Sequence, residues 1–186
     1  MYKSHSFLIV RFVKNNTKMK QNNLKRFFIF LMIFGFWTMN FAQEKAIIKI
    51  LNRELKREVK NQLKSSNFNG DTIKIVKEFS IIDQKLTFQI KKTSPYLAGY
   101  QIIKQEVPLN KILKIGKDIQ IILETEKDAV TTTYTTFDET EKKEKLNESL
   151  FFLYLSNEKQ NDDLGIEIQK AFQKAGFKVI KDYWYD

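Results

Sequence analysis

Hydrophobic residues recur at helical spacing over residues 44–65. Apolar side chains return there at every fourth position, which is the pattern of an amphipathic helix with one face on a core. A turn sequence containing Gly70 follows and predicts the end of this helix. The repeating positions are Ile47, Leu51, Leu55, Val59 and Leu63.

From residue 72 onward the hydrophobic period changes from four to two, which predicts β-strands. The clearest case is Leu86, Phe88 and Ile90, which alternate with Thr87 and Gln89. Such alternation is typical of a strand with one face on a core and the other in water. We predict strands over residues 73–82, 86–91, 100–107, 119–123 and 130–137.

Three further stretches have less regular patterns. Residues 108–118 begin with Pro and have Gly near their end, which predicts a short helical crossing. Residues 138–148 are densely charged, so we expect a solvated loop. Residues 149–155 are almost continuously apolar, so we expect a strand in the centre of the sheet.

The C-terminal part of the sequence predicts one more helix and a final strand. Asn161 precedes two aspartates and is expected to be the helix N-cap. Gly176 is expected at the left-handed position that ends the helix. A last strand is expected over residues 177–185. The apolar face of this helix consists of Leu164, Ile168, Ala171, Phe172 and Ala175.

This order of elements predicts an α+β fold. We expect an antiparallel meander sheet of about six strands, with an N-terminal and a C-terminal helix packed on it. A sheet curled into a roll similar to pleckstrin-homology (PH-like) folds is one arrangement of this order; the likeness is one of element order only. The expected core residues are Leu51, Leu55, Val59, Phe88, Ile121, Leu123, Phe152, Tyr154, Ile168 and Phe172.

Residues 19–42 have the layout of a secretory signal peptide. Basic residues come first, an apolar run over residues 27–37 follows, and the segment ends at the small residue Ala42. The run is shorter than the roughly 20 residues that span a bilayer, so we expect cleavage after Ala42 and a periplasmic or secreted bacterial protein. The alternative is a membrane anchor retained through residues 27–41. For residues 1–18 we expect a start codon assigned upstream of the true first residue, Met19; the alternative is an extended basic region of the signal peptide.

Composition limits the chemistry that residues 43–186 can perform. This part contains 25 Lys and Arg against 22 Asp and Glu, so its net charge is only about +3 and does not indicate nucleic acid binding. It contains no Cys, His or Met. Thiolate catalysis, a Ser-His relay and an ordinary zinc site are therefore excluded, and we expect neither cofactor nor metal. A single domain of this length can bury a core without disulfides.

One face of the first predicted helix is strongly basic. Like charges four residues apart repel each other by a few tenths of a kcal/mol per pair, and a tolerated cost of this kind is typical of a surface with an acidic partner. The alternative is a solvated face in a lysine-rich protein. The candidate ligand-binding residues of this basic ridge are Lys49, Arg53, Lys56, Arg57, Lys60 and Lys64.

Other patterns give weaker candidates. Tyr183, Trp184 and Tyr185 lie between two aspartates and resemble a platform on which sugars stack; the alternative is a strand closing the core. The pattern Ser156-x-x-Lys159 lacks the partner motifs of penicillin-recognising enzymes, so a polar turn is expected. Asp162, Asp163 and Glu167 have the spacing of a helix N-terminus rather than of a calcium loop.

These observations predict a small, non-enzymatic binding or interaction domain. Its partner is expected to be a protein or a component of the cell envelope, or an anionic surface bound through helix 44–65. Two alternatives stay open: a carboxylate-dependent hydrolase acting on glycans, and a membrane-surface protein held by its N-terminal apolar segment. A pocket with paired carboxylates would favour the hydrolase.

Overall fold

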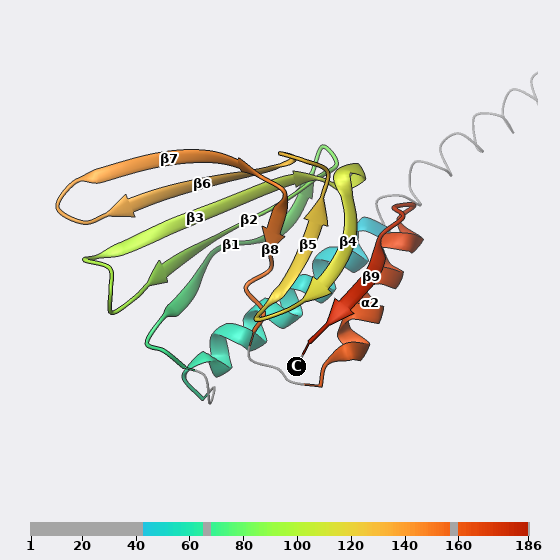
Figure 1. Ribbon diagram of the computed structural model, residues 1–186, viewed down its shortest axis with the longest axis horizontal. Coiled ribbons are helices and arrows are strands. Elements are labelled where there is room, and N and C mark those ends of the chain that lie inside the picture. The colour runs from blue at the N-terminus through green and yellow to red at the C-terminus, as the bar shows by residue number, and fades with distance from the viewer. Residues whose placement is uncertain (1–42, 65–67, 157–159, 186) are drawn as a thin grey trace, which may run out of the picture. The chain divides into compact units, whose positions relative to one another are not determined.

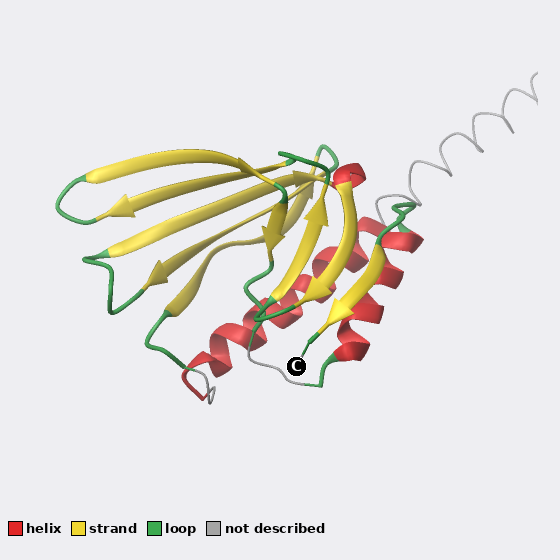
Figure 2. Ribbon diagram, in the orientation of Figure 1, coloured by secondary structure: helices red, strands yellow, loops and turns green. Residues whose placement is uncertain are grey.

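Figures 1 and 2 show the computed structural model, which describes residues 43–64, 68–156 and 160–185. Two α-helices and two β-sheets are present in these residues, so the predicted α+β class is confirmed. The expected export signal, residues 19–42, lies outside the described residues. In the part of the chain that the structure describes, no helix is both long and apolar enough to cross a membrane.

The first helix covers residues 43–61 and continues as the 3₁₀ turn η1 (Gln62–Lys64). Its apolar stripe faces the core as predicted, because Leu51 and Leu55 are fully buried. The stripe ends earlier than predicted, since Val59 is only half-buried and Leu63 is exposed. Polar side chains occupy the inward positions of the last turns instead.

The first sheet contains five strands, and all neighbouring strands run antiparallel. One face buries Leu86, Phe88 and Ile90 together with Ile103 and Val107, while the other face is open to solvent. In spatial order the strands are β1 (Thr72–Ile82), β2 (Lys85–Thr93), β3 (Tyr100–Pro108), β6 (Val130–Phe137) and β7 (Glu141–Glu148).

The second sheet is mixed, because β4 and β9 pair in parallel while the other pairs are antiparallel. Helix α2 (Asp162–Lys174) precedes β9 in the chain and packs against β9 and β4. Gly176 ends this helix at a φ of +87°, as predicted. In spatial order the strands are β8 (Leu150–Phe152), β5 (Ile121–Thr125), β4 (Ile112–Lys117) and β9 (Ile180–Trp184).

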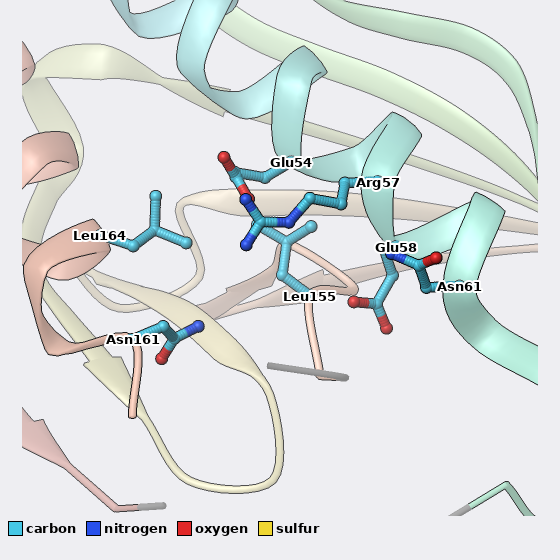
Figure 3. Close-up of a pocket in the computed structure, with 7 residues that line it drawn as sticks. All are labelled: Glu54, Arg57, Glu58, Asn61, Leu155, Asn161 and Leu164. Carbon is cyan, nitrogen blue, oxygen red and sulfur yellow. The ribbon is translucent and has the colours of Figure 1, made fainter. Parts of the chain in front are cut away.

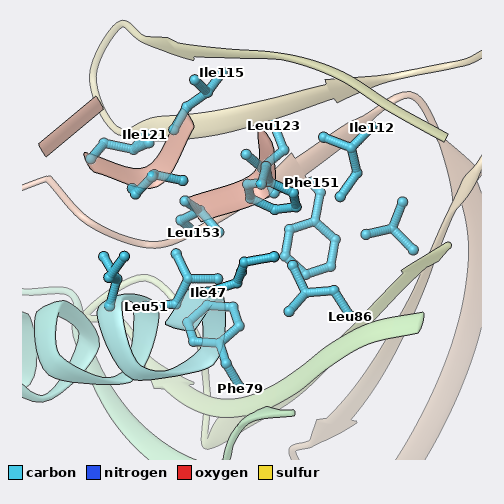
Figure 4. Close-up of a cluster of buried hydrophobic side chains, with 14 of the residues drawn as sticks. Ile47, Leu51, Phe79, Leu86, Ile112, Ile115, Ile121, Leu123, Phe151 and Leu153 are labelled. Carbon is cyan, nitrogen blue, oxygen red and sulfur yellow. The ribbon is translucent and has the colours of Figure 1, made fainter. Parts of the chain in front are cut away.

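The core lies where the inner faces of both sheets meet the first helix (Figure 4). Phe79 stacks on Phe88 with ring centroids 4.4 Å apart, and Phe151 packs on Phe88 at 5.5 Å. Buried Gln105 links the two sheets, because its side-chain Oε1 accepts a hydrogen bond of 3.1 Å from the backbone N–H of Phe152. The three rings join β1 and β2 of the first sheet to the edge strand β8 of the second.

The predicted single meander sheet of about six strands is wrong. The described residues form nine strands in two sheets, and neither sheet closes or curls into a PH-like roll. The chain leaves the first sheet after β3, builds the β4–β5 hairpin in the second sheet, and returns for β6 (Figure 1). Short connections predict neighbours in space, but they do not reveal when a turn transfers the chain to another sheet.

The predicted helical crossing over residues 108–118 is also wrong. Only η2 (Leu109–Lys111) is helical, and strand β4 follows at once. Ile112 and Ile115 are β-branched and both are buried. Their packing in the core outweighs the helical signals of a leading Pro and a trailing Gly, because β-branched residues favour the pleated conformation.

The predicted loop over residues 138–148 contains strand β7 instead. Residues 141–147 are exposed on both sides of this strand, so no hydrophobic alternation marks it in the sequence. It forms through backbone pairing with β6 along its whole length, from Phe137 opposite Glu141 to Val130 opposite Glu148. Charged side chains are a common means of protecting such an edge strand from association.

Two predictions about residues 149–155 are wrong. Strand β8 lies at the edge of the second sheet, not at its centre. Phe151, Leu153 and Leu155 are buried, whereas Phe152 and Tyr154 are only half-buried. The stretch is apolar at nearly every position, so its composition does not reveal which alternate side chains face the core.

Candidate functional site

A cavity of about 160 Å³ lies beside the C-terminal half of the first helix (Figure 3). The helix contributes four polar side chains at successive positions of one face, and the segments before and inside α2 contribute the opposite wall. Among the described residues it is lined by Glu54, Arg57, Glu58, Asn61, Leu155, Asn161 and Leu164.

Two carboxylates in this first cavity are almost completely removed from solvent. Glu54 is 5% exposed and Glu58 is 9% exposed. They are one helical turn apart, so they lie on the same side of the cavity. Buried carboxylates require charged or hydrogen-bonding partners, and both have them in this structure.

Arginines neutralise Glu54. Its carboxylate pairs with Arg53 at 2.5 Å and with Arg57 at 3.5 Å. Arg53 also donates two hydrogen bonds to Glu167 of α2, at 2.6 and 3.1 Å, and thereby joins the two helices. These hydrogen bonds hold the pKa of Glu167 below its usual range. Glu54 is therefore engaged in structural ion pairs.

Glu58 has a different environment and lines a second cavity as well. Its carboxylate accepts a hydrogen bond of 2.8 Å from the hydroxyl of Ser156. The second cavity measures about 260 Å³. Its described lining consists of Glu58, Gln62, Phe68, Asn69, Asp71, Ile73, Lys92, Ile119, Gln120, Tyr154 and Ser156.

An ion pair forms one wall of the second cavity. Lys92 at the end of β2 lies 2.9 Å from the carboxylate of Asp71. Hydrogen bonds from Ser94 and from Lys92 lower the pKa of Asp71. Gln62 is held in place by the backbone of β1, because it accepts a hydrogen bond from Ile73 at 2.8 Å and donates one back at 3.1 Å. These groups are therefore positioned before any ligand arrives.

Tyr154, which lines the second cavity, has an unusual backbone conformation. Its φ is +55°, a left-handed value that is rare for a bulky side chain. The ring packs against Phe88 with centroids 6.0 Å apart. Burial raises the pKa of Tyr154, so its hydroxyl stays protonated and can both donate and accept. Strained residues of this kind are concentrated at functional sites.

The six residues of the basic ridge are all exposed, on the first helix and its terminal turn. The ridge is less basic than its sequence indicates, because Glu54 of the same helix and acids from other elements pair with its residues. Arg53 pairs with Glu54 and Glu167, and Lys56 lies 2.8 Å from Glu78. Arg57 pairs with Glu54. For the other three residues, no ion pair is found among the described residues: Lys49, Lys60 and Lys64.

The three C-terminal aromatics do not share one face. Trp184 points toward α2, where its indole N–H donates to Asn161 Oδ1 at 3.0 Å. Tyr183 and Tyr185 stack on the opposite face of β9, with centroids 5.5 Å apart. Burial and a hydrogen bond to Glu124 raise the pKa of Tyr183 to about 12. Only the two tyrosines therefore remain together as an aromatic platform.

The remaining candidates have structural partners. Asn161 stands at the N-cap position of α2, but its side chain makes no capping hydrogen bond and instead accepts from Lys117 and Trp184. Asp162 pairs with Lys181 at 2.6 Å. Ser156 donates to Glu58, and Lys159 lies outside the described residues. In the part of the chain that the structure describes, no three metal-ligating side chains come together.

Apart from Arg57 of the basic ridge, the residues that line the two cavities were not among the ligand-binding residues predicted from the sequence. The available signal was the replacement of apolar residues by polar ones along the inward stripe of the first helix, at Glu54, Glu58 and Gln62. Comparisons of the chain with protein-family models, with curated proteins and with solved structures give no match. The function is therefore argued from the residues and their geometry.

Proposed function

We propose that this chain is a non-catalytic binding domain that holds a small, uncharged or cationic sugar in the second cavity. The observation that carries the proposal is the position of Tyr154. Tyr154 lines this cavity from a left-handed backbone conformation, together with Glu58 and Lys92. Strain at such a residue persists only where the surrounding structure imposes it.

The size of the cavity favours a small ligand. Its volume of about 260 Å³ is below the range of about 300–1,000 Å³ typical of sites for drug-sized molecules. A single sugar ring is of a suitable size. The apolar side chains of Ile73 and Ile119 provide surface for the C–H face of such a ring.

The polar groups of the cavity suit hydroxyls better than a strong charge. Lys92 is already paired with Asp71, so it contributes a directed donor rather than a free positive charge. Glu58 supplies an acceptor, and Ser156 and Tyr154 supply hydroxyls that donate or accept. The cavity contains two carboxylates, Glu58 and Asp71, against one cation, Lys92. This excess of negative charge favours a neutral sugar or an amino sugar over an acidic one.

The hydrolase alternative receives less support from the carboxylates. Glu54 and Glu58 lie one turn apart on the same helix, whereas glycoside hydrolysis uses two acids that flank the bond from opposite sides. Glu54 is also paired with two arginines, so both of its carboxylate oxygens are already engaged.

Titration with defined sugars tests the proposal. Glucose, N-acetylglucosamine and glucosamine serve as probes at about 10 mM, a concentration that detects ligands with millimolar Kd. At least one should bind residues 43–186, as measured by NMR shifts. Glu58→Gln and Tyr154→Phe should each weaken binding about tenfold or more, and Lys170→Gln on exposed α2 surface is the matched control. Absence of binding by all three sugars would overturn the proposal.

A second measurement separates binding from catalysis. The protein is incubated with a chitin oligosaccharide, and newly formed reducing ends are counted over time. No increase above buffer is expected. Hydrolysis by the wild type that disappears in Glu58→Gln would overturn the non-catalytic assignment and support the hydrolase. With the export signal expected at residues 19–42, we propose the cell envelope as the source of the sugar.

A further inference from the structure

The outer face of the first sheet is a broad surface with a strong positive charge. Strand register places alternate residues of all five strands on this face, opposite the buried set that includes Phe88 and Ile103. Its ionisable residues are seven lysines and two glutamates: Lys74, Lys77, Lys85, Lys91, Lys104, Lys143, Lys145, Glu106 and Glu141.

The lysines are arranged in rows that cross the sheet. In the first row, lysines on β1, β3 and β7 alternate with hydrogen-bonding residues on β2 and β6. Neighbouring strands are about 4.8 Å apart, so these lysines recur about every 9.6 Å. A second row lies one side-chain repeat further along the strands. The rows are Lys77-Gln89-Lys104-Thr133-Lys145 and Lys74-Lys91-Ile102-Thr135-Lys143.

Two lysines of the second row face each other directly. Lys74 and Lys91 are cross-strand partners on β1 and β2. Like charges in this position destabilise a sheet, and a polyanion bound across them would relieve that repulsion. The only ion pair found within the face, among the described residues, joins Lys104 to Glu106 at 2.8 Å. Most of the positive charge is therefore not compensated on the face itself.

We propose that the outer face of the first sheet binds a linear acidic polysaccharide. The first row places a positive charge on every second strand, and Gln89 and Thr133 lie between these charges. A chain of sugars with acidic groups offers anions and hydroxyls in alternation, which matches this pattern. The proposal is independent of the second cavity, whose lining includes Ile73 and Lys92 of the opposite face of this sheet.

Nucleic acid fits this surface less well. Single strands bind by stacking their bases on exposed aromatic rings, and the two aromatic side chains of this face, Tyr100 and Phe137, are already stacked on each other. Tyr100 stacks on Phe137 with ring centroids 4.7 Å apart. Lys91 Nζ lies 3.5 Å from the centroid of the Tyr100 ring. Neither side of that ring is free to receive a base.

A lipid surface fits less well for a different reason. Proteins that lie on membranes insert a band of large apolar side chains below the charged groups. The two lysine rows contain one large apolar residue, Ile102, and it is only half-exposed. Threonine and glutamine fill the other positions between the lysines.

The test measures binding of residues 43–186 to polygalacturonate, with dextran as a neutral control. Binding to polygalacturonate should be detectable at low salt and should weaken steeply toward physiological salt. The triple variant Lys77→Gln, Lys104→Gln and Lys145→Gln should lower affinity about tenfold or more. The control Lys170→Gln, Lys174→Gln and Lys178→Gln removes the same charge from another exposed surface and should lower affinity less than about twofold.

Three outcomes would overturn the proposal. The first is no binding to polygalacturonate at low salt. The second is an equal loss of affinity in the sheet variant and in its control. A ridge variant, Lys49→Gln, Lys60→Gln and Lys64→Gln, is measured as well, and a loss of affinity confined to this variant would likewise overturn the proposal and favour the first helix. The third is tighter, sheet-dependent binding to phosphatidylglycerol vesicles or single-stranded DNA. Glu58→Gln should leave polygalacturonate binding unchanged, which separates this proposal from sugar binding in the cavity.

Discussion

The side-chain amide of Asn52 pairs with both backbone groups of Phe79. Asn52 Nδ2 donates to the Phe79 carbonyl at 2.9 Å, and the Phe79 N–H donates to Asn52 Oδ1 at 2.7 Å. Gln62 makes the same pair of contacts with Ile73. The first helix therefore satisfies backbone groups along the free edge of β1, a position that would otherwise be open to pairing with another chain.

Replacement of Asn52 by Leu should destabilise the domain by roughly 2 kcal/mol. The change leaves one backbone donor and one backbone acceptor of Phe79 without partners in a partly buried position. Urea denaturation measures the free energy of unfolding. Asn52→Asp, which keeps the acceptor but not the donor, should have an intermediate effect. A loss below about 0.5 kcal/mol for Asn52→Leu would contradict this role.

Phe151 should matter more than Phe152 for stability. Phe151→Ala removes a fully buried ring that packs on Phe88, and the expected cost is about 3–5 kcal/mol. Phe152→Ala should cost less because its side chain is half-buried. Equal losses in the free energy of unfolding for the two variants, measured by urea denaturation, would contradict the alternation of buried and half-buried side chains over residues 151–155.

Gly165 should not tolerate a larger side chain. A Cβ atom at this position of α2 would lie 2.5 Å from the ring of Trp184. We expect Gly165→Ala to displace the ring, with a net loss of roughly 1 kcal/mol after the better helix propensity of Ala is counted. Trp184 is the only tryptophan after residue 42, so its fluorescence should shift to the red. An unchanged emission spectrum would contradict the contact.

The pair of Arg53 and Glu167 predicts part of the acid sensitivity. Hydrogen bonds from Arg53 lower the pKa of Glu167 in the folded state below its usual 4.5. A lowered pKa stabilises the fold above the unfolded value, and this contribution is lost as pH falls through the folded value. The loss should be below about 1 kcal/mol, because both side chains are partly exposed. Denaturation from pH 5 to 2 should show a shallower decline for Glu167→Gln.

Processing of the N-terminus stays a prediction from the sequence. Cleavage after Ala42 should leave Gln43 as the first residue of the exported protein. Intact-mass measurement of protein recovered from the periplasm or medium checks this. Recovery of a species that still contains residues 27–37 would instead support the retained anchor.

Local patterns were enough to predict several elements correctly. The i+4 stripe containing Leu51 and Leu55 predicted the first helix, and Gly176 predicted the end of α2. The alternation from Leu86 to Ile90 predicted strand β2 and the side that it buries. These features depend on one buried face and on backbone conformations near single residues, and both leave a periodic or compositional mark in the chain.

The tertiary structure alone decided three features. These are the division into two sheets, the existence of β7, and which alternate side chains of residues 151–155 face the core. Each depends on which strands pair through their backbones. Pairing gives no alternation of polar and apolar residues in a strand that is charged on both faces or apolar on both. The cavities were decided in the same way. Glu58 on the first helix, Lys92 on β2 and Tyr154 after β8 are far apart in the sequence. Only the packing of the helix across both sheets brings these three side chains to one cavity.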